Sequence, residues 1–475
     1  MKNAFRLIFA ALLAVLICAS CVSGPEESIA DISEVSGLPS VSDEISEISE
    51  VSEPERNLQT MAVATIGSSG DILVHNGVRN SGYDSSTGSF DFSYGFQYLA
   101  PYVKALDYAV VNAEFSVSAN GTYSSLPFRV PAEIVEALAE CGYDMGTTAN
   151  NHISDGGWAG MKKTMETLNA QGMDFTGTRI NSEDARYLIK DINGIKVGFL
   201  SYSYGAYTNT NCFNTSNLEA FYTEAATLIE GMRTDGAEIV YLYIHWGAEY
   251  SLAPNESQQA IAQKMCDLGV DVIIGGHPHK IQPVELIHSE VSGKDTICLY
   301  SMGNLWSGQQ IECMAGGTQA NSPHCFQDPW HFAGCDYPDV ADRTLDTHRL
   351  EHGTNCNDNG HTEDGVVFMT SICRYEDGTV AIASVDVLPV WCMGRGLKKA
   401  SNPINSYHSE YYCIPLAKNV DWQAEFGLSN AEYTEARYSY ERTMALLSDG
   451  INEINTHLAE QYDNLNQQFK EGLEK

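Results

Sequence analysis

The chain has 475 residues, of which 43% are hydrophobic and 19% are charged. This composition is typical of a folded protein with a buried core, and it excludes a disordered or fibrous chain. The 62 acidic and 27 basic residues give a formal charge of −35, which argues against binding to nucleic acid through a basic surface. We therefore expect no nucleic-acid partner.

The N-terminal 21 residues have the pattern of a bacterial secretory signal. Two basic residues precede an apolar run that is too short to favour a membrane-spanning helix, and Ala19 and Ser20 lie directly before Cys21. Small residues before a cysteine resemble a bacterial lipoprotein cleavage site, although Cys18 stands where leucine is usual. We expect residues 1–21 to be a lipoprotein-type signal peptide and Cys21 to be lipidated. Cleavage and release without a lipid is the alternative.

Residues 22–58 repeat serine, glutamate and single aliphatic residues, with no basic residue before Arg56. Such a segment cannot bury enough apolar surface to offset the entropy that it would lose on folding. We expect a disordered Ser/Glu-rich tether between a lipid anchor and a folded domain. The predicted location is therefore the extracytoplasmic face of a bacterial cell membrane.

Short aliphatic strands then alternate with helical stretches in which apolar residues recur every three to four positions. The predicted strands are 61–67, 108–114, 195–203, 238–244, 271–276 and 296–302, and the predicted helices are 131–140, 157–171, 217–233 and 255–268. Alternation of this kind indicates a layered α/β fold in which helices flank the β-sheets.

The alternation stops between residues 306 and 362, a polar stretch that we interpret as an insertion. A separate structural metal site in this histidine- and cysteine-containing stretch is the alternative, although it lacks the short paired ligand spacings of a zinc module. Two strands at 366–375 and 379–390 resume the sheet. We therefore expect one domain over residues 59–393 and a C-terminal extension over 394–475, helical from about residue 430.

Polar residues follow the predicted strands at the points where the strands end. They are Asp71, Asn112, Glu114, Asn151, His152, His245, His277 and His279. Side chains from distant segments converge at the carboxyl ends of strands in open α/β sheets. Carboxylates, carboxamide oxygens and neutral imidazoles are ligands for Zn²⁺, Mn²⁺ or Fe²⁺. The pattern therefore predicts a metal centre at this edge.

Six stretches carry a resemblance to a known family. They are SSGDIL (68–73), DYAVVNAEFSV (107–117), TTANNHISDGG (147–157), YIHWGAEYSLAPNESQQAIAQ (243–263), LGVDVIIGGHPHKIQPVE (268–285) and LYSMGN (299–304). Together and in this order they resemble the CapA family, bacterial proteins associated with poly-γ-glutamate capsule synthesis that belong to the calcineurin-like metallophosphoesterase superfamily. The resemblance implies the layered α/β fold of that superfamily.

The resemblance also implies one role for each matching residue. The implied metal ligands are Asp71, Glu114, Asn151, His245, His277 and His279. Glu114 would bridge two metals, with Asp71 and His279 in the first site and the other ligands in the second. His152 would be the catalytic residue, donating a proton to the leaving group while a metal activates water for attack on a phosphorus or carbonyl centre.

One position departs from the superfamily pattern. Its first motif is Asp, any residue, His, whereas Leu73 stands two positions after Asp71. The first metal site therefore lacks one ligand. His75 is an imperfect replacement, because at strand spacing it shares the face of Asp71 but lies farther along the chain. We expect one divalent ion, Mn, Fe or Zn, in the second site and a weak or absent ion in the first.

Four further residues are candidates for substrate binding, namely Asn112, Trp246, Tyr250 and Asn304. The rings of Trp246 and Tyr250 suit the lining of a cleft, and packing beside the sheet is the alternative. Asn304 would lie near the metals or shape a turn.

The function implied by the resemblance is a metal-dependent hydrolase or transferase in the biosynthesis of poly-γ-glutamate, an anionic capsule polymer. The implied partners are an anionic polymer or phosphoester substrate and capsule-synthesis membrane proteins. Two alternatives stay open. Leu73 favours a non-catalytic accessory protein that binds polymer or synthase, whereas the Asn151 and His152 pair suits the enzyme or an extracellular phosphodiesterase or nucleotidase.

Overall fold

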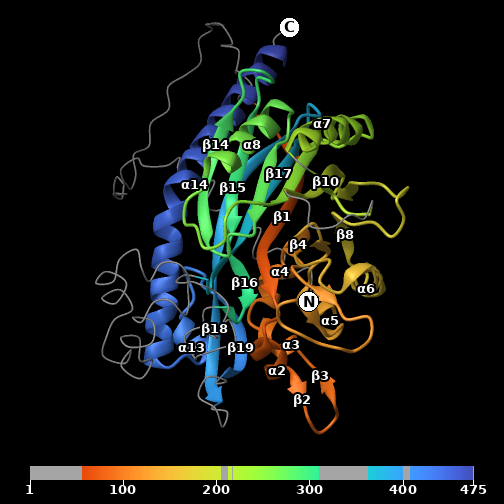
Figure 1. Cartoon of the computed structure of the whole chain (residues 1–475). Helices are drawn as coiled ribbons and strands as arrows, with labels where there is room; N and C mark the ends of the chain where they lie inside the picture. The colour runs from red at the N-terminus through yellow and green to blue at the C-terminus, as the bar shows by residue number, and fades with distance from the viewer. Residues whose placement is uncertain (1–55, 205–211, 217, 310–361, 399–406, 474–475) are drawn as a thin grey trace, which may run out of the picture. The chain divides into compact units, whose positions relative to one another are not determined.

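The computed structural model describes residues 56–204, 212–216, 218–309, 362–398 and 407–473 (Figure 1). The predicted signal peptide, Cys21, almost all of the predicted tether and most of the predicted insertion lie outside the described residues. Contacts within the chain define two units, one of residues 59–465 and one that joins the two chain ends. In the latter, the Leu58 N–H donates a 2.8 Å hydrogen bond to Asn466 Oδ1.

The larger unit contains two β-sheets. The first has the order β19-β18-β17-β1-β4-β7-β8, with β16 also paired to β1. These strands are β19 (Tyr407–Pro415), β18 (Val380–Lys398), β17 (Asp364–Tyr375), β1 (Thr60–Leu73), β4 (Tyr108–Asn112), β7 (Met145–Thr147), β8 (Asp174–Thr176) and β16 (Asn304–Ser307). β1, β4, β7 and β8 run parallel, so their carboxyl ends lie at one edge.

The second sheet has the order β11-β10-β12-β13-β15-β14, with β9 also paired to β10. These strands are β9 (Leu188–Ile192), β10 (Ile195–Tyr204), β11 (Thr215–Ser216), β12 (Ile239–His245), β13 (Val272–Gly276), β14 (Ile281–His288) and β15 (Asp295–Met302). β10, β12, β13 and β15 run parallel and form the centre of this sheet.

The two sheets pack face to face. Successive side chains of a strand point to opposite faces of its sheet, so one set lies in the core between the sheets and the other set lies in an outer core. On β4, Val110 lies in the core between the sheets, whereas Val111 faces the opposite side. On β12, Tyr241 and Tyr243 enter the core between the sheets, and Leu242 faces outward. The buried strands are therefore apolar on both faces, as the continuous aliphatic runs predicted.

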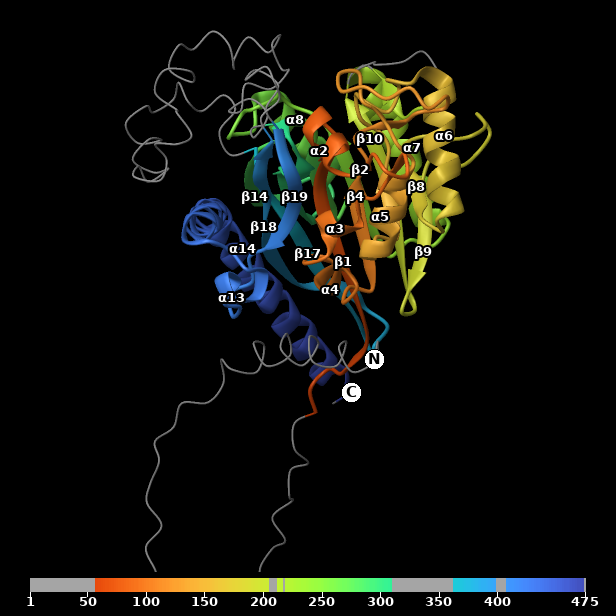
Figure 2. The ribbon, with the colours of Figure 1, turned by 90° about the horizontal axis from the view of Figure 1, so that it is seen from below.

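Helices cover both outer faces. The first sheet is covered by α2 (Asn76–Ser81), α3 (Ser93–Phe96), α4 (Ala100–Val103) and α5 (Glu133–Cys141), with α6 (Gly157–Ala170) beside β8. The second is covered by α7 (Leu218–Thr234) and α8 (Glu256–Asp267). The short α13 (Trp422–Phe426) precedes the long α14 (Asn430–Leu473), and Figure 2 shows α14 on the same side as β14 and β18.

Two small pairs of strands complete the unit. β2 (Tyr83–Asp84) pairs with β3 (Ser89–Phe90), and β5 (Ser116–Val117) pairs with β6 (Arg129–Val130). Among the described residues, no helix is both long and apolar enough to cross a membrane.

The predicted layered α/β fold, with helices flanking β-sheets, is confirmed. All six predicted strands and all four predicted helices of the central region are present. The predicted insertion begins at about residue 306 and lies mostly outside the described residues, and Trp306 and Ser307 at its start are buried in β16. A strand of four residues is too short to show a period, so its pairing to β1 could not be predicted.

Candidate metal centre

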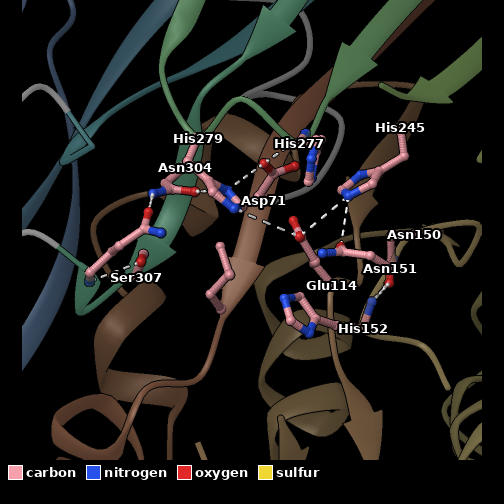
Figure 3. Close-up of polar contacts among 12 residues, drawn as sticks. Asp71, Glu114, Asn150, Asn151, His152, His245, His277, His279, Asn304 and Ser307 are labelled. Atoms are coloured by element: carbon pink, nitrogen blue, oxygen red, sulfur yellow. Dashed lines mark hydrogen bonds and ion pairs between the residues drawn. The ribbon is translucent and has the colours of Figure 1, made fainter. Parts of the chain in front are cut away.

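Three parallel strands of the first sheet bring polar side chains to one edge. Asp71 on β1 pairs in register with Asn112 on β4, and Asn112 pairs with Thr147 on β7. Glu114 follows β4 after one residue, and Asn151 follows β7. This register places Asp71, Glu114 and Asn151 around one point, as Figure 3 shows.

The second sheet supplies three histidines to the same point. His245 is the last residue of β12 and pairs in register with Gly276, the last residue of β13. His277 and His279 follow in a turn around Pro278, and both have positive φ angles, of 94° and 58°. Their rings lie 5.9 Å apart, and the rings of His245 and His277 lie 4.7 Å apart. The turn brings both imidazoles to one centre, where a ligand atom of each lies within 4.8 Å of the other and of Glu114.

Glu114 lies at the middle of the cluster. Its Oε1 is 3.4 Å from His245 Nε2 and 3.9 Å from His279 Nε2. Asn151 Oδ1 lies 2.9 Å from the same His245 nitrogen. In each of two triads, Glu114 with His277 and His279 and Glu114 with Asp71 and His245, the potential ligand atoms lie within 4.8 Å of one another.

The donor atoms fit a divalent transition metal ion. Glu114 Oε1, His245 Nδ1 and His277 Nδ1 are buried without a hydrogen-bond partner among the described residues. A buried polar atom left unsatisfied costs about 1–3 kcal/mol, which a bound cation removes for the atoms that it ligates. Gly276 leaves space beside Asp71, since a Cβ at position 276 would lie 2.9 Å from Asp71 Oδ1.

Burial sets the charge state of the cluster. It raises the pKa of Glu114 well above the usual value, and the nearby charge of Asp71 adds to this. Burial lowers the pKa of His245 well below its usual value and the pKa of His277 to about 4, with neighbouring imidazoles adding to both shifts. His245 and His277 are therefore neutral near pH 7, which is the form that binds metals.

The third histidine is held differently. His279 Nδ1 lies 3.1 Å from Asp71 Oδ2 and 3.1 Å from Asn304 Oδ1. The Asn304 amide donates to Gln309 Oε1 and to the Thr362 carbonyl, which orients its oxygen toward His279. Burial opposes protonation of His279, but the hydrogen bond and charge of Asp71 leave its pKa above the usual value.

No replacement ligand stands near Leu73 among the described residues. Leu73 is buried in the apolar core of the first sheet. The alternative candidate His75 lies outside both metal-binding triads. Its Nδ1 is 3.3 Å from the Leu73 carbonyl oxygen, its ring packs 4.9 Å from Phe128, and burial lowers its pKa to about 3. Neither Leu73 nor His75 therefore adds a ligand beside Asp71.

His152 lies beside the cluster rather than within it. Its Nδ1 is 2.8 Å from Asp155 Oδ2, and the same oxygen accepts a 2.5 Å hydrogen bond from the Phe128 N–H. The Phe128 ring packs edge-on against the imidazole at 4.7 Å. Sequence reasoning missed Asp155 and Phe128, although a carboxylate three residues after His152 was a usable signal.

The substrate-binding candidates occupy three different environments. Trp246 is buried, donates to the Tyr300 carbonyl oxygen and stacks on the Tyr300 ring, so the structure supports packing rather than a place in a cleft. Tyr250 has a φ of 67°, and its ring lies 6.1 Å from that of His279. Asn112 and Asn304 are buried and bond to Asp71 and His279, respectively.

Comparison with known proteins decides the family. The model of the bacterial capsule synthesis protein PGA_cap family matches residues 65–309, a range that contains every proposed ligand. The chain belongs to this family. The predicted resemblance is thereby confirmed.

Two curated relatives are similar to this range. The PGA biosynthesis protein CapA of Bacillus subtilis (strain 168) is 30% identical over 221 residues, which cover 44% of this chain and 55% of that protein. The capsule biosynthesis protein CapA of Bacillus anthracis is 27% identical over 247 residues, 50% of this chain and 57% of that protein. The chain thus spans about half the length of the curated relatives that it matches.

Similarity to solved structures is lower. A hypothetical protein from Thermus thermophilus matches with a TM-score of 0.38 and 12% identity, over 68% of this chain and 99% of that one. The 5'-nucleotidase from Candida albicans matches with a TM-score of 0.31 and 14% identity, over 52% of this chain and 48% of that one.

Proposed function

We propose that this protein is a metal-dependent hydrolase or transferase in the synthesis of an anionic capsule polymer, poly-γ-glutamate. One observation carries the proposal. A buried set of nitrogen and oxygen atoms without hydrogen-bond partners among the described residues lies beside a histidine that is held by a carboxylate. Two curated relatives are named for synthesis of a capsule or of PGA, which supports the choice of polymer.

The proposed metal ligands are Glu114, Asn151, His245 and His277, together with His279, whose Nε2 lies 3.9 Å from Glu114 Oε1. A divalent Mn, Fe or Zn ion held there would supply Lewis-acid chemistry, neutralising charge on the reacting centre and lowering the pKa of water. Asp71 and Glu114 are fully buried and His245 is 3% exposed, so these three side chains are shielded from bulk water.

His152 is the proposed proton donor to the leaving group. Asp155 accepts from its Nδ1, which fixes the orientation of the imidazole. The packing of Phe128 against the ring restricts its rotation. His152 can therefore present its other nitrogen, Nε2, as a proton donor in a constant position.

A non-catalytic accessory role is the second candidate. The observation that favours it is Leu73, an apolar residue where the superfamily pattern has a ligand. A Mycobacterium tuberculosis relative, 21% identical over 201 residues, is named a probable polyglutamine synthesis accessory protein. In this reading the same cluster binds polymer or a membrane-bound synthase without turnover.

The proposed location is the extracytoplasmic face of a bacterial cell membrane, with a lipid on Cys21. The proposal rests on the sequence pattern before Cys21 and on the acidic tether that follows. A polymer or phosphoester substrate outside the cytoplasm would then reach the centre without crossing the membrane.

The test incubates the Mn²⁺-loaded full chain with poly-γ-glutamate and, separately, with bis-p-nitrophenyl phosphate. We expect shorter polymer by size-exclusion chromatography, and the variant His152→Ala should lower kcat at least about 100-fold with metal content unchanged. The control is His288→Ala, an exposed histidine outside the cluster. Release of nitrophenol without polymer cleavage would favour a phosphodiesterase, and polymer binding without cleavage would favour the accessory role.

A further inference from the structure

Asn112 joins the two carboxylates of the centre. Its Nδ2 donates a 2.7 Å hydrogen bond to Asp71 Oδ1 and lies 3.4 Å from Glu114 Oε2. The side chain is 5% exposed, so water does not compete for these bonds. The amide therefore fills the space between Asp71 Oδ1 and Glu114 Oε2, where a cation that bridges these two oxygens would have to bind.

The orientation of this amide follows from its neighbours. Asn150 donates from Nδ2 to the Ala113 carbonyl oxygen at 2.9 Å and accepts at Oδ1 from the His152 N–H at 3.2 Å, so two backbone groups orient its carboxamide. The same Asn150 Nδ2 and the Thr147 hydroxyl both donate to Asn112 Oδ1, each at 3.2 Å.

A flipped Asn112 would lose these bonds. Its oxygen would face the oxygens of Asp71 and Glu114, and its NH₂ group would face the NH₂ group of Asn150. The backbone around Asn150 thus determines that Asn112 presents two N–H groups to the carboxylates.

This arrangement divides the carboxylate oxygens into two sets. Asn112 bonds Asp71 Oδ1 and faces Glu114 Oε2, and Asp71 Oδ2 accepts from the His277 N–H at 3.2 Å. Glu114 Oε1 points away from Asn112 and has no hydrogen-bond partner among the described residues. A cation beside Glu114 Oε1 is therefore compatible with the network, whereas a cation on Asp71 Oδ1 would meet the N–H groups of Asn112.

We propose that Asn112 limits this centre to one divalent cation, because its amide holds Asp71 and the second oxygen of Glu114 in place of a second cation. Leu73 contributes by removing a ligand on the same side. Asn112 is in this view a residue that determines metal stoichiometry, and the inference rests on the metal site proposed above.

The test measures metal content rather than turnover. The full chain and the variant Asn112→Asp are equilibrated with excess Mn²⁺, and bound manganese per chain is measured by elemental analysis after removal of free metal. We expect one Mn²⁺ in the wild type and two in Asn112→Asp, where a third carboxylate replaces the donor. The control is Asn120→Asp, which adds the same charge on an exposed loop and should bind one.

The outcomes separate the two proposals. Two Mn²⁺ in the wild type, or one in a folded Asn112→Asp, overturns the role of Asn112 but leaves the metal site intact. No Mn²⁺ in the wild type overturns the proposed function and this inference together. If Asn112→Asp does not fold, the variant Asn112→Ala is used, because it removes the donor without adding charge. We then expect a second Mn²⁺ that binds with lower affinity. A single bound Mn²⁺ in Asn112→Ala overturns the inference.

Discussion

At the scale of single residues, the side chains of two neighbouring residues orient the His152 imidazole. Asp155 Oδ2 accepts from both the imidazole and the Phe128 backbone, so the carboxylate is itself held in place. The Phe128 ring then packs against the imidazole that Asp155 orients. Three contacts thus determine the position of the imidazole that we propose as the proton donor, and only Asp155 brings a formal charge to it.

The variant Asp155→Asn removes that charge and keeps an oxygen in the same position. We expect kcat to fall by about 100-fold, the lower end of what general acid catalysis contributes, with bound metal unchanged. Asp377→Asn in an exposed turn is the matched control. Steady-state kinetics measure kcat, and elemental analysis measures the bound metal per chain. Equal loss of metal and turnover would show that Asp155 supports the metal site instead.

At the scale of elements, α14 contributes side chains to the buried core. Leu447, Ile451 and Ile454 pack into the core between the sheets. Gly450 permits this approach, because a Cβ there would lie 2.2 Å from the Val284 carbonyl oxygen of β14. Asn455 extends the pairing of β18 by bonding both the N–H and the carbonyl oxygen of Val385, each at 2.9 Å.

Arg442 of α14 pairs with Asp364 at 2.8 Å and with Glu363 at 3.2 Å, and all three side chains are largely buried. The variant Arg442→Met leaves two buried carboxylates without this cation, so we expect a loss of about 3–5 kcal/mol in the free energy of unfolding. Urea denaturation followed by circular dichroism provides the value.

The matched control lies on the same helix. Arg437 pairs with Glu441 at 2.6 Å, but both side chains are exposed. Arg437→Met should therefore cost less than about 1 kcal/mol. Equal losses for the two variants would mean that burial of the Arg442 pairs does not contribute.

At the scale of the whole molecule, the chain combines a folded α/β unit with a long acidic N-terminal segment. The formal charge of −35 disfavours long-range attraction of a polyanionic polymer. A cation within the buried cluster would reverse the field locally. Attachment to a membrane would then decide which substrates the centre meets, because diffusion alone does not favour an anionic one.

The attachment is tested with Cys21→Ala in a bacterial host supplied with labelled palmitate. The wild-type chain should incorporate label and sediment with membranes, whereas Cys21→Ala should be unlabelled and released. Cys18→Ala is the control, since Cys18 precedes the expected cleavage site. Release of all three proteins into the medium to the same extent would contradict lipidation.

The sequence by itself determined the central strands, the main helices and the family. Residues 239–244 and 272–276 are short continuous apolar runs, which are typical of strands in a sheet buried on both faces. The positions of Asp71, His245 and His277 near strand ends could also be predicted, because ligand-binding side chains gather at the carboxyl ends of parallel strands. That Asp71 comes from one sheet and the two histidines from the other could not be predicted.

Only the tertiary structure decided which atoms are free to bind a metal. The bond from Asn112 to Asp71 depends on the register between β4 and β1, and the orientation of Asn112 depends on a backbone carbonyl beyond β4. The burial of Trp246 and the pairing of β16 also depend on segments distant in sequence. Local residue patterns specify the elements and the candidate ligands, whereas hydrogen-bond partners follow from how the sheets align. That alignment leaves Glu114 Oε1 without a hydrogen bond to any described residue, while Asp71 Oδ1 accepts a hydrogen bond from Asn112.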